Sequence, residues 1–221
     1  MNRPNPIATT LPRYQGMTFP TDFGFYRSSM SDLVIAHHKN NPPLFYISTN
    51  NGFSSKPSVV LHSGPSQAQP PLAFALFHSF SSTIDIKIGN NVVYVNKESA
   101  FSSTYSFTFA IQGRLEKFEW KNSSGAEVQA LNGSSHGMKL VRVATGSVVA
   151  AWTRPHSGTA KQGKMKFRAK DRGALGNDFE KVVVISIAAI MEKLRRAAKR
   201  RQGATTSNSA LSASSVSGPS C

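Results

Sequence analysis

Residues 177–201 read NDFEKVVVISIAAIMEKLRRAAKRR, and this stretch decides the fold. Asn177 is suited to cap a helix, and Glu180 follows three residues later, as in a capping box. Over 182–191 every residue is apolar except Ser186, so a helix here has no polar stripe to turn toward water. A helix that is apolar all round is buried on every side. The sequence therefore predicts a C-terminal helix that the rest of the chain encloses.

The apolar run of this helix is too short to cross a bilayer, which takes about twenty residues. Residues 182–185, VVVI, would also suit a central strand, because β-branched residues are common in strands. The capping residues before the run and the alanines after it favour the helix. The residues expected to lie buried along it are Val183, Val184, Ile187, Ile190 and Met191.

The chain before this helix is typical of short antiparallel strands separated by Gly, Pro and Asn turns. TIDIKI at 83–88 and YSFTFAI at 105–111 alternate apolar and polar residues, as half-buried strands do. The predicted strands are 33–36, 44–48, 59–62, 72–80, 83–88, 92–95, 105–111, 114–120, 126–131, 138–143, 148–153 and 164–169. We therefore expect a mainly β fold, a closed antiparallel barrel of about twelve strands enclosing a hydrophobic C-terminal helix. Aromatic residues on these strands are expected to line its core rather than to stack on bases.

Three segments are expected. Residues 1–19 carry several prolines and are predicted to form a flexible arm. Residues 20–202 form the barrel, with its central helix at 177–201. Residues 203–221 are rich in Ser and Ala and are predicted to be disordered.

The chain is strongly basic, with 26 Lys and Arg against 11 Asp and Glu, a net charge of +15. Such a charge attracts nucleic acid, anionic lipid or acidic proteins, although it also serves solubility. The single cysteine, Cys221, permits no internal disulfide, and no signal peptide or spanning segment is recognisable. We expect an intracellular protein that is cytoplasmic, peripheral on a membrane, or nuclear.

The segment KMKFRAK at 164–170 is the first candidate binding surface. Its period of two places four cations on one face of a strand, where a multivalent anion such as a phospholipid headgroup would relieve their repulsion. The alternative is a solvated outer strand whose lysines discourage edge pairing. The candidate anion-binding residues are Lys164, Lys166, Arg168, Lys170 and Arg172.

The basic end of the helix is the second candidate. Its cations could simply stabilise the helix C-terminus, could bind anionic lipid, or could act as a nuclear localisation or nucleic-acid patch. These residues are Lys193, Arg195, Arg196, Lys199, Arg200 and Arg201.

Motifs for catalysis are lacking. The six histidines show no HExxH spacing, no serine lies in GxSxG, and the Gly173–Gly176 turn lacks the Lys and Ser or Thr of a phosphate-binding loop. We therefore expect no catalytic residues, no metal site, no cofactor and no enzymatic activity.

Four segments taken together, 44–65, 105–120, 137–152 and 172–193, resemble the tubby-like C-terminal superfamily. That superfamily includes the LURP-one-related proteins of plants and the phospholipid scramblases, and the likeness is to its fungal members, over about residues 20–200. The resemblance implies a twelve-stranded barrel around a hydrophobic C-terminal helix. It also implies phosphoinositide binding through basic residues on the barrel, without assigning positions here. We expect a non-catalytic protein that binds acidic phospholipid at an intracellular membrane surface; a nucleic-acid or transcription-linked protein and a protein-binding scaffold are the alternatives.

Overall fold

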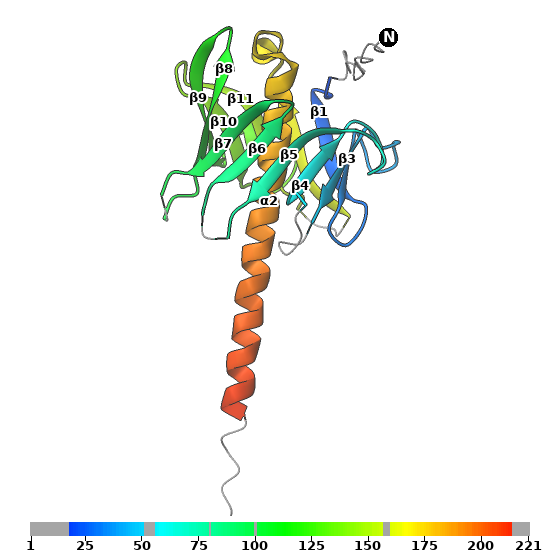
Figure 1. The fold of residues 1–221 in the computed structure, drawn as a ribbon, viewed down its shortest axis with the longest axis vertical. Coiled ribbons are helices and arrows are strands. Elements are labelled where there is room, and N and C mark those ends of the chain that lie inside the picture. The colour runs from blue at the N-terminus through cyan, green and yellow to red at the C-terminus, as the bar shows by residue number, and fades with distance from the viewer. Residues whose placement is uncertain (1–17, 51–55, 80, 100, 157–159, 214–221) are drawn as a thin grey trace, which may run out of the picture.

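The computed structural model describes residues 18–50, 56–79, 81–99, 101–156 and 160–213. In this part of the chain twelve strands close into one antiparallel barrel, and helix α2 runs through it and out at the far end (Figure 1). The elements are β1 (Asp22–Arg27), β2 (Leu33–Ala36), β3 (Phe45–Thr49), β4 (Val59–His62), β5 (Pro71–Phe77), β6 (Ile84–Ile88), β7 (Asn91–Lys97), β8 (Tyr105–Ile111), β9 (Arg114–Ser123), α1 (Ala126–Gln129), β10 (Gly137–Arg142), β11 (Ser147–Thr153), β12 (Lys161–Phe167) and α2 (Ala169–Ala213). The predicted fold class is confirmed.

The topology is a simple meander. Each strand pairs with its neighbours in sequence, and β12 returns to pair with β1, which closes the barrel. The ladder between β7 and β8 is short, with the pairs Asn96 to Ser106 and Lys97 to Tyr105. Because successive strands alternate in direction, β12 ends at the end of the barrel where α2 enters, and β1 and β11 end where α2 leaves.

Alternating side chains build the interior. In β6 the isoleucines at 84, 86 and 88 are buried, while Asp85 and Lys87 face outward. In β9 Phe118 and Trp120 are fully buried and pack toward α2, where Phe118 meets the ring of Phe179 at 4.6 Å between centroids. The period-two pattern read from the sequence thus separates core from surface as predicted.

The middle of α2 is enclosed on every side. Val183, Val184, Ile187 and Ile190 have no exposed surface, and Met191 is partly buried at the edge of the core. The helix is therefore the centre of the hydrophobic core, as predicted.

The one polar residue of the buried run, Ser186, is fully hydrogen-bonded. Trp120 Nε1 donates to Ser186 Oγ over 2.9 Å, and Ser186 Oγ donates to the carbonyl of Val183 over 2.9 Å. A buried polar group needs such partners to avoid a desolvation penalty. This contact joins β9 to α2 and fixes their relative position.

The helix is longer than predicted at both ends. It begins at Ala169, and Gly176, at φ 81° and ψ 165°, forms a kink between a first short helical segment and the long helix that follows. The helix also continues past Arg201 to Ala213, so it includes part of the segment 203–221 that was predicted to be disordered, whereas 214–221 lie outside the described residues. Adding residues to an existing helix needs no new nucleation, and this allows the polar tail to continue it.

The predicted N-terminal arm lies outside the described residues except at its end. Phe19 is 2% exposed and stacks on Phe45, with ring centroids 4.3 Å apart. The packed domain therefore begins before residue 20.

One predicted strand is wrong and one observed strand was missed. Residues 126–131 contain helix α1 instead of a strand, and the two buried residues of this segment, Val128 in the helix and Leu131 just after it, are three apart, which is a helical spacing. Strand β1 was missed because Gly24 interrupts the alternation of apolar and polar residues in its sequence. Phe23 and Phe25, on either side of Gly24, are fully buried. A Cβ at Gly24 would lie 2.6 Å from the ring of Tyr26, so a larger residue there would force the Tyr26 side chain to move.

Replacing Ile187 by Asp should destabilise the protein by more than about 4 kcal/mol, because an unpaired charge would be buried in the core. The free energy of unfolding in urea measures this, with Ala198→Asp on the exposed part of α2 as control. An Ile187→Asp protein as stable as the control would contradict the enclosure of α2.

Replacing Ser186 by Ala should cost about 1–3 kcal/mol, because the indole N–H of Trp120 loses its acceptor in the core. In a Trp120→Phe background the same substitution should cost much less, which a double-mutant cycle of unfolding free energies would detect. Equal costs in both backgrounds would mean that the hydrogen bond adds nothing.

Candidate functional site

The predicted basic strand is only partly an exposed cationic face. In β12 Met165 and Phe167 are buried, and Lys166 on the opposite face is exposed. The strand ends at Phe167, so Arg168 follows it and Lys170 belongs to the first turn of α2. The predicted row of cations is therefore not one continuous strand face.

Two residues of that predicted set already have acidic partners. Lys164 Nζ lies 3.3 Å from a carboxylate oxygen of Asp22. Arg172 forms a two-point ion pair with the buried Glu180, and it also donates to the carbonyl of Phe19 and contacts the ring of Phe167. Arg172 thus fastens the start of α2 to the N-terminal segment instead of facing a ligand.

Three of the six predicted cations at the basic end of the helix also make contacts within the protein. Lys193 Nζ donates to the carbonyls of Ser81 and Ser82 over 3.1 and 2.7 Å. Partial burial lowers the pKa of Lys193, and the charge of Lys97 lowers it further. Lys193 therefore anchors α2 to the loop before β6.

Arg195 and Arg196 share the carboxylate of Glu192, at 2.6 and 2.7 Å from their Nε atoms. Arg196 also donates to the carbonyl of Asn50 over 2.6 Å and covers the ring of Phe77 at 5.0 Å. These contacts hold α2 where it leaves the barrel.

The other three predicted cations, Lys199, Arg200 and Arg201, have exposed side chains on the part of α2 that projects beyond the barrel (Figure 1). This end is opposite the one where β12 passes into α2, so the two predicted basic clusters do not meet. We call the loops 28–32, 81–83, 101–104 and 154–156, which surround the departing helix, the exit rim.

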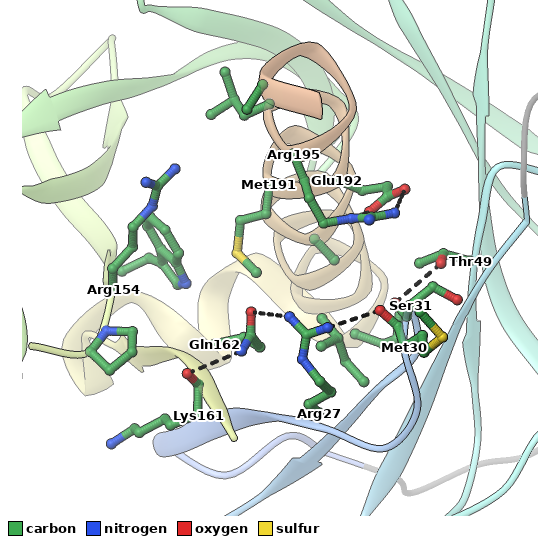
Figure 2. Close-up of a pocket in the computed structure, with 17 residues that line it drawn as sticks. Arg27, Met30, Ser31, Thr49, Arg154, Lys161, Gln162, Met191, Glu192 and Arg195 are labelled. Atoms are coloured by element: carbon green, nitrogen blue, oxygen red, sulfur yellow. Dashed lines mark hydrogen bonds and ion pairs between the residues drawn. The ribbon is translucent and has the colours of Figure 1, made fainter. Parts of the chain in front are cut away.

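A cavity of about 380 Å³ lies between α2 and the exit rim (Figure 2). On the barrel side it is lined by three cations, Arg27, Arg154 and Lys161. On the helix side Arg195 and the only acidic lining residue, Glu192, lie next to one another. This arrangement suits an anion.

Sequence reasoning missed this cavity. Arg27 ends β1, Arg154 follows β11 and Lys161 begins β12, so barrel closure and strand direction bring together residues that are far apart in sequence. No local motif marks them; a clue would have been that each cation stands at the end of a strand.

Two other arrangements offer less. Ser48 Oγ and His62 Nε2 lie 3.0 Å apart, and His62 Nδ1 lies 2.9 Å from the carbonyl of Gln69, but both side chains are buried and line none of the cavities found. Within the described residues, no three His, Cys, Asp or Glu side chains are grouped to hold a metal ion. Nor does any helix of the described segments have the length and hydropathy needed to cross a bilayer.

Replacing Arg172 by Ala should cost about 3 kcal/mol or more in unfolding free energy, because the buried Glu180 loses its counterion. The exposed neighbour Lys166, replaced by Ala, should change stability by no more than about 0.5 kcal/mol. Equal stability of the two variants would show that Arg172 is not structural.

Comparison of the chain with protein-family models, with curated proteins and with solved structures finds no match.

Proposed function

We propose that this protein is a non-catalytic β-barrel that binds acidic phospholipid headgroups at a membrane surface through its exit rim and the projecting part of α2. The observation that carries the proposal is that exposed cations and exposed apolar side chains occur together at this end. Peripheral membrane proteins combine these two features, because apolar side chains enter the interface while cations pair with anionic lipids.

The apolar contribution comes from three side chains. Met30, in the loop after β1, is 88% exposed, and Phe101, in the loop after β7, is fully exposed. Leu194 on α2 is 42% exposed just where the helix leaves the barrel. Large apolar side chains at loop tips gain little from water and are suited to a lipid interface.

The cationic contribution comes from Lys199 and Arg200 on α2, together with Arg154 on the rim, which are all exposed. Each basic residue near an anionic membrane contributes about 1 kcal/mol to binding. Glu192, the acidic residue nearest to them on the helix, is already paired with two arginines.

The outer face of β12 is the competing membrane surface. Lys166, Arg168 and Lys170 are exposed there, but Lys164 is paired with Asp22 and Arg172 with Glu180. We therefore prefer the exit rim to the surface first predicted.

Membership of the tubby-like superfamily remains a proposal as well. It is supported by the barrel of twelve strands around a hydrophobic helix, the architecture that the resemblance implies. Phosphoinositides are accordingly the acidic phospholipids that we would test first.

Nucleic-acid binding is the second candidate, because α2 carries Lys199, Arg200 and Arg201 clear of the barrel. Binding through phosphate contacts would weaken steeply with salt and would show no lipid preference.

Vesicle co-sedimentation distinguishes these surfaces. With phosphatidylcholine vesicles containing a minor fraction of phosphatidylinositol bisphosphate, Lys199→Gln with Arg200→Gln should weaken binding by about 2 kcal/mol, roughly thirtyfold. Lys166→Gln with Arg168→Gln removes the same charge from the β12 face and should leave binding unchanged.

If only the β12 variant loses binding, the membrane-binding surface is the one first predicted. If the wild-type protein pellets equally with pure phosphatidylcholine, or does not pellet at all, the lipid function is wrong. A salt-dependent shift of duplex DNA in the latter case would favour the nucleic-acid alternative.

A further inference from the structure

The cavity at the exit rim holds cations that the protein does not neutralise. Arg27 donates to two neutral groups, the carbonyl of Met30 over 2.9 Å and Oε1 of Gln162 over 3.2 Å (Figure 2). Arg154 and Lys161 have no carboxylate partner in the described part of the chain. Partial burial lowers the pKa of Lys161 and the charge of Lys164 lowers it further, while the carboxylate of Asp22, which is paired with Lys164, acts in the opposite direction.

The carboxylate that lines this cavity cannot supply the missing charge. Both oxygens of Glu192 accept hydrogen bonds from Arg195, and Oε1 also accepts one from Arg196 over 2.7 Å. The negative charge of Glu192 is thus paired with two arginines of α2. Arg27, Arg154 and Lys161 therefore leave an excess of positive charge on the barrel side of the cavity.

Trp152 supplies a second and independent indication of a ligand. It is 5% exposed and lines the cavity, and its indole N–H has no acceptor among the described residues. The other tryptophan, Trp120, donates to Ser186. A buried donor without an acceptor is uncommon because it carries a desolvation penalty.

This N–H lies next to β12, beside the cationic cavity. A Cβ added to Gly163 would lie 2.3 Å from Trp152 Nε1, so the nitrogen lies against β12. Lys161 and Gln162, the residues just before Gly163, line the same cavity. The nitrogen has almost no accessible surface, so an anionic oxygen that pairs with Lys161 or Arg154 would accept from Trp152 after a small shift of the indole ring away from β12.

Part of the lining is apolar. Leu33 and Ile47 from the barrel and Ala188 and Met191 from α2 border the cavity, together with the neutral polar residues Ser31 and Thr49. Its volume of about 380 Å³ is near the small end of the range for small-molecule sites, roughly 300–1,000 Å³. One hydrocarbon chain suits this space better than the two chains of a phospholipid.

We propose that this cavity binds a single-chain amphiphile with an anionic head, a carboxylate or a phosphate. The head accepts a hydrogen bond from Trp152 and pairs with Arg154 and Lys161, while the chain lies along Met191 and the barrel wall. The site goes beyond membrane-surface binding, since a molecule would be held singly inside the rim and by different residues from Lys199 and Arg200.

Nuclear magnetic resonance of the two indole N–H groups tests the proposal on the full chain. With decanoate, below the concentration at which it forms micelles, the Trp152 proton signal should move downfield as its hydrogen bond forms, and the Trp120 signal should stay in place. Trp152→Phe assigns the signals. Decyl phosphate has the same chain with a phosphate head group in place of the carboxylate. A downfield shift of the Trp152 proton with decanoate or with decyl phosphate supports the site.

Decanol, which has the same chain but no charge, should leave the Trp152 proton in place. Arg154→Gln with Lys161→Gln should weaken calorimetric binding of the anion by about tenfold or more, whereas Lys199→Gln with Arg200→Gln should leave it unchanged. A shift with decanol equal to that with decanoate, no shift with either anion, or undiminished binding by the Arg154 and Lys161 variant would overturn the proposal. Vesicle binding by the wild-type protein is a separate outcome, so either proposal can fail alone.

Discussion

The constraint on which the structure depends is the burial of an apolar helix that has no solvent-facing side. The consecutive residues Val182, Val183, Val184 and Ile185 point in different directions around α2, yet none has exposed surface. A flat sheet could cover only one side of such a helix, whereas a closed barrel covers all of it. Closure of β1 against β12 is therefore required by the helix sequence as much as by the strands.

Polar contacts position this helix along its axis. Apolar packing alone would tolerate a small sliding of α2, but three contacts at different heights restrict it. Arg172 pairs with Glu180 at the entrance, Ser186 bonds Trp120 in the middle, and Lys193 holds the carbonyls of Ser81 and Ser82 at the exit. Two of these cations were predicted to bind ligands, and their actual partners explain why basic residues near a core helix are ambiguous in sequence.

Much of the fold could be predicted because it follows from local patterns. The alternation in 105–111 and the unbroken apolar run in 182–191 each reflect an environment that a short segment determines. The strand prediction for residues 126–131 was wrong because this segment is too short for the helical spacing of Val128 and Leu131 to be recognised. The cavity at the exit rim could not be predicted, since Arg27, Arg154 and Lys161 meet only when strand directions and barrel closure are known.

The distribution of acidic partners explains where the surplus charge lies. On the barrel wall several carboxylates are close to cations: Glu116 pairs with Arg142, and Glu119 lies between Lys117 and Lys121. Ion pairs of this kind near the surface contribute little stability, but they leave the charge of this part of the wall mixed. At the exit rim Glu192 is shared by two arginines, and Asp32 accepts hydrogen bonds from Tyr46 and Thr49. Exposed cations therefore lie both at the exit rim and on the outer face of β12, and these are the two surfaces whose positive field would attract an anion.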